Sequence, residues 1–173
     1  ILHPLALKQR IPNQKFYFEV GAKKDFVEKI ESPFIYSFSG KFKATDWYSA
    51  VFNFSKNFRY PSFNDLYWKP GGNLNLKSEV SHQAELGNNF AHKGFKLNLT
   101  PYYMRIENMI RWLPNSGGIW SPINTNKVES YGMESQLDFE KKFGKNKAKF
   151  SAGYIFIHSK DLETNRFLMY VPK

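Results

Sequence analysis

The residues of this chain that could perform chemistry are its histidines and carboxylates, and their spacing does not form a site. The four histidines, His3, His82, His92 and His158, are scattered, and the chain has no cysteine. No closely spaced pair of carboxylates accompanies a histidine at the spacing of metal ligands. The sequence also has no Gly-X-Ser-X-Gly elbow, phosphate loop or dinucleotide fingerprint. We therefore predict no catalytic residues, no bound metal and no cofactor, and we interpret the histidines as surface or rim residues.

Two aromatic segments could instead bind a ligand. Residues 59–76, RYPSFNDLYWKPGGNLNL, are too aromatic for an ordinary solvent loop and too rich in Pro, Gly and Asn for a strand or helix. Residues 111–124, RWLPNSGGIWSPIN, hold two tryptophans around a Gly-Gly turn. Exposed rings can stack on a flat or apolar ligand, but such rings also pack within loops or form the aromatic belt at a membrane surface. Packing and belt positions are the favoured interpretation, and the candidate substrate-contact residues are Trp112, Trp120 and Tyr67.

The first of these segments has the residues of a folded loop. Pro61 presets a bend, and Gly71 and Gly72 allow backbone angles that other residues avoid. Asn64 and Asp65 can accept hydrogen bonds from nearby main chain. We expect Arg59 to form an ion pair with a carboxylate of a neighbouring strand. Three rings are expected to pack inward or onto the rim of the fold: Phe63, Tyr67 and Trp68.

Alternation of apolar and polar residues is the dominant periodic signal along the chain. In residues 36–43 every second residue is aromatic or glycine and the intervening ones are Ser or Lys. Each such segment places an aromatic face opposite a polar one. Pro101 cannot donate a ladder hydrogen bond, so we expect a bulge beside it. The pattern predicts seven strands, near residues 14–22, 33–44, 47–57, 80–90, 95–112, 124–143 and 148–159.

The connections between these strands alternate in length. Those near residues 45, 92 and 145 are short, whereas 21–33, 57–79 and 113–123 are long and irregular. Short turns at one end and long loops at the other are typical of an up-and-down outer-membrane barrel, with the aromatic face on lipid and the polar face lining the lumen. Alternation alone fits a soluble antiparallel sandwich with one buried face as well.

Composition narrows the function classes. Aromatic residues make up 18% of the 173 residues, and no apolar run exceeds the five residues Phe167 to Val171, which excludes a transmembrane helix. The net charge of +10 raises nucleic acid as a partner. However, the lysines of 141–149 straddle a short turn without an aromatic platform, so we predict a solvated turn and no nucleic-acid binding.

The chain starts and stops in mid-pattern, and we expect it to be a piece of a longer polypeptide.

The loop residues and the strand that follows them carry a resemblance to a known family. Residues 58–87 resemble the barrel signature of TonB-dependent outer-membrane receptors, in which an aromatic-Arg-X-Pro-small-aromatic segment leads to Leu-Tyr, then Gly-Asn-X-X-Leu, Glu-X-Ser and Glu-X-Gly. Leu74 and Ser78 stand where the family often has Pro. Weaker similarities are VESYGMESQLDFEKKF and FLMYVPK, which ends the chain. The matching residues are Phe58, Arg59, Pro61, Ser62, Phe63, Leu66, Tyr67, Gly72, Asn73, Leu76, Glu79, Ser81, Glu85 and Gly87.

The resemblance implies a fold, a function and partners. Residues 1–173 would be an interior to late part of a 22-stranded barrel, without its plug domain. The implied function is non-enzymatic, TonB-coupled import of an iron chelate, haem, cobalamin or glycan through the outer membrane of a Gram-negative bacterium. The implied partners are outer-membrane lipid, the TonB complex acting through the plug, the ligand and a surface lipoprotein. The rival interpretations are a complete small eight-stranded barrel acting as an adhesin or anchor, and a soluble carbohydrate-binding β-sandwich.

Overall fold

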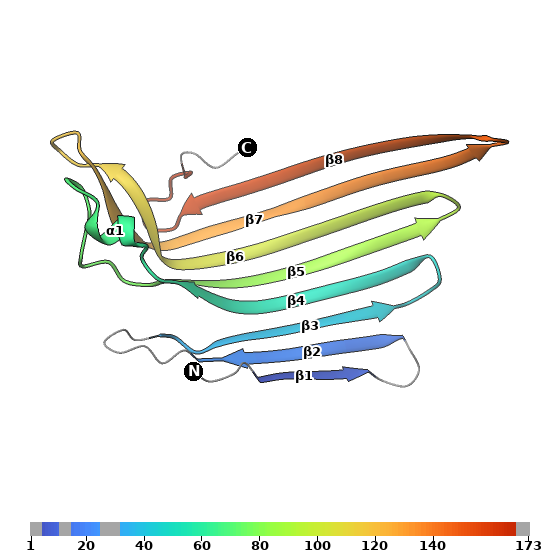
Figure 1. Cartoon of the computed structure of the whole chain (residues 1–173), viewed down its shortest axis with the longest axis horizontal. Helices are drawn as coiled ribbons and strands as arrows, with labels where there is room; N and C mark the ends of the chain where they lie inside the picture. The colour runs from blue at the N-terminus through green and yellow to red at the C-terminus, as the bar shows by residue number, and fades with distance from the viewer. Residues whose placement is uncertain (1–4, 11–14, 25–31, 169–173) are drawn as a thin grey trace.

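The described part of the chain is one antiparallel sheet of eight strands in sequence order (Figure 1). The computed structural model describes residues 5–10, 15–24 and 32–168. No second sheet packs on this one within those residues. None of the described helices has the length and apolar content needed to cross a bilayer. The elements are β1 (Leu5–Arg10), β2 (Phe16–Lys23), β3 (Ile35–Lys43), β4 (Tyr48–Arg59), α1 (Phe63–Tyr67), β5 (Glu79–His92), β6 (Phe95–Pro114), β7 (Trp120–Phe143) and β8 (Asn146–Asp161).

The register of the sheet separates an aromatic face from a polar face. Phe38 lies opposite Phe54, and Gly40 lies opposite Phe52, so rings of neighbouring strands gather on one side. The Phe52 ring covers Gly40 so closely that a Cβ on the glycine would lie 2.3 Å from the ring. On the other side Asn53 lies opposite Glu85. The alternation read from the sequence is therefore confirmed as the organising feature of the sheet.

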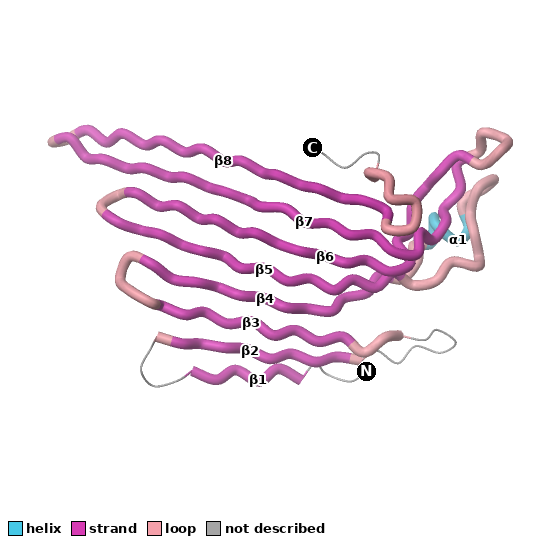
Figure 2. The backbone as a smooth tube through the Cα atoms, turned by 180° about the vertical axis from the view of Figure 1, so that it is seen from behind, coloured by secondary structure: helices cyan, strands magenta, loops and turns pink. Residues whose placement is uncertain are grey.

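The connections at the two ends of the strands differ, and we call these ends of the sheet the short-turn edge and the long-loop edge (Figure 2). The short-turn edge carries the connections 44–47, 93–94 and 144–145, and the long-loop edge carries the connections after β2, β4 and β6. Positive φ angles at Lys93 (45°), Gly94 (84°) and Gly144 (59°) close the two-residue turns. A Cβ at Gly94 would lie 2.1 Å from the carbonyl oxygen of Glu140, so only glycine fits beside that strand.

The buried core is small and lies on the polar face near the long-loop edge. It contains Ile106, Val128 and Leu168, which are 7%, 1% and 8% exposed. Met104 and Met109 pack against it. A single open sheet has no partner layer to cover its aromatic face, so many of the rings on that face stay exposed.

Three details of the predicted strands are wrong. An eighth strand, β1, pairs with β2, and its residues LALKQR were not predicted as a strand because they do not alternate between apolar and polar. Residues 113–123 are not a long irregular loop, because β6 runs to Pro114 and β7 starts at Trp120. No bulge occurs at Pro101, since Glu85 pairs with Tyr102 and Asn88 with Leu99 at one constant offset.

Candidate functional site

The loop between β4 and β5, residues 60–78, is folded around the one-turn helix α1. Ser62 is the N-cap, and its hydroxyl oxygen accepts a hydrogen bond from the backbone N–H of Asp65 at 3.2 Å. The Asp65 carboxylate in turn accepts from the backbone N–H of Ser62 at 2.8 Å. This reciprocal capping box satisfies helix donors that have no partner within the helix. The predicted folded loop is thus confirmed, with a helical turn that the Pro and Gly content concealed.

Asp65 links the loop to the β6–β7 hairpin. Its carboxylate is nearly buried and accepts a hydrogen bond from the Trp112 indole N–H at 2.9 Å. Arg59 lies 3.6 Å from the same carboxylate. Burial acts to raise the pKa of Asp65, but the hydrogen bonds from Ser62 and Trp112 and the charge of Arg59 outweigh it, and the pKa of this carboxyl lies below its ordinary value.

Glu79 joins three strands at the base of the loop. It lies opposite Arg59 in the β4–β5 ladder, and its carboxylate is 3.2 Å from the guanidinium. The same Glu79 carboxylate accepts from the backbone N–H of Ile110 on β6 at 3.0 Å. The predicted ion pair of Arg59 with a neighbouring strand is therefore confirmed, and Arg59 also reaches Asp65.

The Gly-Gly-Asn turn of the loop lies against the backbone of β7. The Ser121 hydroxyl donates to the carbonyl of Gly71 at 2.6 Å, and the Asn73 side-chain amide donates to the carbonyl of Pro122 at 3.0 Å. A Cβ at Gly71 would lie 2.0 Å from the carbonyl oxygen of Trp120. Glycine is required here because two backbones meet, rather than because of an unusual φ angle.

A second set of hydrogen bonds joins the loop to the same hairpin through Asn124. The Asn124 side chain accepts from the backbone N–H of Lys77 at 2.8 Å and donates to the carbonyl of Lys77 at 3.1 Å and that of Asn108 at 2.7 Å. These bonds, those of Ser121 and Asn73, and the bond of Asp65 to Trp112 fix the loop on the hairpin. The hairpin bends out of the line of the sheet beside α1 (Figures 1 and 2). We call residues 60–78 together with 109–125 the docked rim.

The docked rim exposes apolar side chains at the long-loop edge. Phe63 and Tyr67 contact each other at 4.7 Å between ring centroids and remain 77% and 54% exposed. Trp120 is 45% exposed and Leu74 is 68% exposed. Such a surface can bind by ring stacking and apolar contact.

The three predicted contact residues differ in their exposure and in their contacts. Trp112 is half-buried, with its indole N–H bonded to Asp65 and its ring edge-on to Trp68 at 5.4 Å. Trp120 and Tyr67 present exposed rings, and neither has a ring contact with Trp112 in the described structure. Phe63, Tyr67 and Trp68 were predicted to pack inward or onto the rim. All three lie in the rim, where Trp68 packs on Trp112, but Phe63 and Tyr67 pack on each other and are not turned inward, because both remain more than half exposed.

The other residues of the predicted motif have structural positions in the rim. Pro61 leads into the capping box, and Gly72 donates its backbone N–H to the carbonyl of Trp68 and lies so close to the Leu66 carbonyl that an added Cβ would be 2.7 Å from that oxygen. The prediction that Asp65 accepts a hydrogen bond from nearby main chain is confirmed by its bond from the Ser62 N–H, whereas its contact with Trp112 and the rim positions of Ser121 and Asn124 were not predicted. The spacing Ser62-X-X-Asp65 was a readable capping signal, but nothing in the local sequence shows that Ser121 and Asn124 meet residues some fifty positions away.

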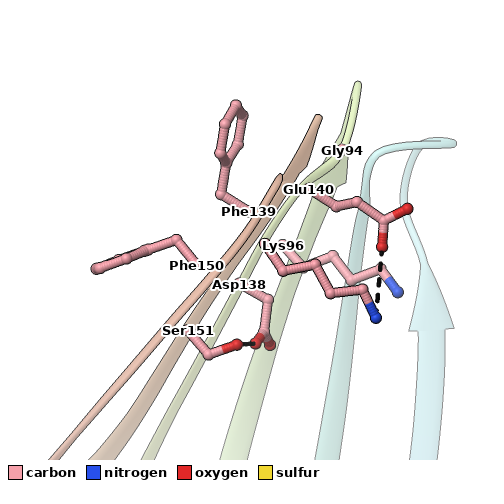
Figure 3. Close-up of a pocket in the computed structure, with 8 residues that line it drawn as sticks. Gly94, Lys96, Asp138, Phe139, Glu140, Phe150 and Ser151 are labelled. Atoms are coloured by element: carbon pink, nitrogen blue, oxygen red, sulfur yellow. Dashed lines mark hydrogen bonds and ion pairs between the residues drawn. The ribbon is translucent and has the colours of Figure 1, made fainter. Parts of the chain in front are cut away.

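A hollow at the short-turn edge illustrates the two faces of the sheet (Figure 3). Phe139 and Phe150 point to one side and Asp138 and Glu140 to the other. The Ser151 hydroxyl donates to Asp138 at 2.6 Å, and Lys147 lies 2.7 Å from Glu140. Because these carboxylates already have partners, the hollow is a satisfied polar network of the sheet.

The histidines do not converge in the described structure. No group of three His, Cys, Asp or Glu side chains there could hold a metal ion. His82 lies near Tyr36, and His158 stacks on Tyr131 at 4.7 Å. His3 lies outside the described residues, as does most of the segment FLMYVPK.

A sheet with one aromatic face, one polar face, short turns along one edge and folded loops along the other is a section of an outer-membrane β-barrel wall. The family model described as TonB dependent receptor-like, beta-barrel, matches residues 11–173. The chain belongs to this family, whose members are receptors and transporters of the Gram-negative outer membrane. The predicted family, fold class and location are confirmed.

Relatives and solved structures agree with this assignment. The chain is 35% identical over 97 residues to the vitamin B12 transporter BtuB of Vibrio vulnificus, covering 56% of this chain and 16% of the relative. The BtuB protein of Photobacterium profundum is 36% identical over 91 residues, covering 50% and 15%. The siderophore receptor PirA of Pseudomonas aeruginosa shares the fold at a TM-score of 0.69 and 19% identity, covering 90% of this chain and 33% of that one. The ferric enterobactin receptor PfeA of the same species gives 0.72 and 20%, covering 94% and 28%. The chain therefore spans about a sixth of the length of the curated relatives it matches.

Proposed function

We propose that this chain supplies barrel wall and outward-facing loops to an outer-membrane receptor that imports a scarce nutrient with energy relayed by the TonB complex. The observation that carries the proposal is the family match over residues 11–173. The docked rim supports it, because a loop held on a hairpin by side-chain and backbone bonds presents its exposed rings in a fixed arrangement. A fixed arrangement reduces the conformational entropy lost when a ligand binds. The protein would act without catalysis.

Cobalamin is the first ligand to test. Both curated relatives described above are vitamin B12 transporters, at 35% and 36% identity over about half of this chain. The solved structures of siderophore receptors share the fold at or below 20% identity, so they support an iron chelate less strongly. Haem and a glycan are further candidates of the same kind, since each offers an apolar or flat surface to aromatic rings.

Within the rim, we place ligand contact on Tyr67 and Trp120 and give Trp112 a supporting role. The first two rings are exposed, whereas the Trp112 indole holds the buried carboxylate of Asp65. The remaining partners follow from position. Lipid would cover the aromatic face, and the TonB complex would act through a plug domain outside this segment. A surface lipoprotein could rest on the exposed Phe63 and Leu74, and nucleic acid is not a partner.

The test measures ligand binding by the full-length receptor in outer-membrane vesicles. Labelled cyanocobalamin, a ferric catecholate siderophore, haemin and a maltooligosaccharide are titrated against wild type, Tyr67→Ala and Trp120→Ala. Trp47→Ala is the matched control, because Trp47 is 51% exposed and lies at the short-turn edge. We expect saturable binding of one probe, about 5- to 50-fold weaker in either rim variant and unchanged in the control.

Two outcomes would contradict these proposals separately. Saturable binding that is equal in all variants would refute ligand contact at Tyr67 and Trp120 and leave the receptor in place. Absence of binding and of energy-dependent uptake for all four probes would favour a barrel that acts as an adhesin or anchor.

A further inference from the structure

One row of residues that crosses the aromatic face from strand to strand carries mostly charged side chains instead of aromatic rings. Successive ladder pairs place one residue from each of six neighbouring strands, β3 to β8, directly side by side (Figure 1). We call this set the charged row: Tyr36, Lys56, His82, Arg105, Glu129 and Lys160. Since it has the same parity as the rings of the aromatic face, its side chains emerge on the surface that lies outside the barrel.

The next row toward the short-turn edge is aromatic in most positions. The same ladders align Phe38, Phe54, Ala84, Tyr103, Tyr131 and His158. Tyrosines at such a position mark the boundary between lipid tails and headgroups. One row farther corresponds to two residues, or about 7 Å along a strand. The charged row therefore lies at the depth of the headgroups, on the long-loop side of the apolar band.

Within the part of the chain that the structure describes, the cations of the charged row form no ion pairs. Among the described residues, no carboxylate lies within 4.0 Å of the charged atoms of Lys56, Arg105 or Lys160. The Arg105 Nε is buried and has no hydrogen-bond partner in the described structure. Glu129, the only carboxylate of the row, accepts a hydrogen bond from the Tyr103 hydroxyl at 3.0 Å.

The next row toward the long-loop edge leaves the excess of positive charge unchanged. Glu107 lies opposite Lys127 there, so that row adds one carboxylate and one cation. The two rows together hold four cations, Lys56, Arg105, Lys127 and Lys160, and two carboxylates, Glu107 and Glu129, with His82 between Lys56 and Arg105. The ladder neighbours of Arg105 are His82 and Glu129, and the ammonium groups of Lys56 and Lys160 follow one strand farther on each side. This arrangement suits a phosphate, because arginine binds phosphate oxygens through two N–H groups and the long lysine side chains can reach toward the same phosphate.

We propose that the charged row binds the phosphate of an anionic lipid headgroup in the outer leaflet. The lipid tails would lie on Phe38, Phe54 and the neighbouring rings, and the phosphate would rest on Arg105 between Lys56 and Lys160. This proposal rests on the membrane location of the barrel and not on the transported ligand. It gives the outer wall of this segment a specific lipid site in addition to general contact with the bilayer.

The experiment uses the full-length receptor in detergent and counts bound lipid by native mass spectrometry. The probes are bisphosphorylated lipid A and its dephosphorylated form, which share the same acyl chains. We expect the Lys56→Gln, Arg105→Gln, Lys160→Gln triple variant to bind the phosphorylated probe about tenfold more weakly and the dephosphorylated probe unchanged. The matched control removes three exposed lysines outside the row, with Lys69→Gln, Lys77→Gln and Lys145→Gln, and should bind like wild type.

Folding of each variant is checked by its heat-dependent mobility on gels. If the triple variant does not assemble, the single variants Arg105→Gln and Lys160→Gln replace it, and each should weaken the phosphorylated probe alone. Equal binding in wild type and row variants would overturn the proposal. Equal loss of binding of both probes in the row variants would also overturn the proposal, because the row would then act on the acyl chains. An equal loss of binding in the matched control would overturn it as well, because the net charge of the protein would then be enough to explain binding.

Discussion

The middle of the sheet and the docked rim are built by different kinds of interaction. In the sheet each strand pairs with its sequence neighbours, and the ladder offset stays constant even across Pro101. In the rim the decisive bonds join residues that are forty-seven to fifty positions apart, such as Asp65 with Trp112 and Gly71 with Ser121. The sheet therefore tolerates changes that respect its two faces, whereas the rim depends on a few particular side chains and on the glycines Gly71 and Gly72, which lie against backbone.

The largest expected effect tests the two faces of the sheet. Phe52→Arg places a charge on the aromatic face, where arginine near the middle of the bilayer costs about 2–4 kcal/mol. Asn53→Arg, the next residue on the same strand, places the charge on the polar face, and it should assemble like wild type. Assembly is measured as the folded fraction of the full-length protein in outer membranes, by heat-dependent mobility. Equal tolerance of both variants would mean that the aromatic face does not meet lipid.

This difference between the regions also explains what the sequence could predict. The alternation in residues 36–43 indicated β3 and its two faces, because a period of two is a local property of a strand. Arg59 could be assigned an ion pair because a cation at a strand end beside a polar ladder needs a carboxylate, and Glu79 supplies it. The extension of β6 and β7 was hidden, because Pro114, Pro122 and the Gly-Gly turn resemble a loop until the loop 60–78 docks on them.

The next largest effect tests the close contact at the top of the rim. Gly71→Val would drive a side chain into the carbonyl of Trp120, where even a Cβ lies at 2.0 Å. Because the obstacle is backbone, the loop must move, and we expect a cost of about 3 kcal/mol in docking. Spin labels at Leu74→Cys and Ile119→Cys, both exposed positions, report the distance between loop and hairpin in the full-length protein. The labels are placed in a cysteine-free background, which this segment already provides.

The control for that variant is Gly87→Ala on β5. Its added Cβ meets its nearest neighbour at 3.6 Å, an ordinary contact. The distribution of label distances should broaden and lengthen for Gly71→Val and stay narrow for Gly87→Ala. An unchanged distribution in both would show that the loop and the hairpin are held by other contacts.

The smallest effect is a pH dependence that only the rim should show. The pKa of Asp65 is lower in the docked loop than its ordinary value of 3.8, because hydrogen bonds from Ser62 and Trp112 and the charge of Arg59 outweigh burial. Docking therefore favours the ionised carboxylate, and this contribution is complete above the ordinary value and is lost as the pH falls through the lower, docked value. The Leu74 and Ile119 label distance should stay constant from neutral pH to about pH 5 and lengthen toward about pH 2.

Two substitutions separate this mechanism from general acid unfolding. Asp65→Asn should dock less tightly at neutral pH and lose the pH dependence, because its amide does not ionise. Asp46→Asn should keep the dependence, since the Asp46 carboxyl also has a lowered pKa but lies with Lys43 at the short-turn edge, away from the rim. A pH response that survives Asp65→Asn would assign it to another group. A response that disappears only in that variant would show that one buried carboxylate couples the loop to the hairpin, while the sheet beneath keeps its register.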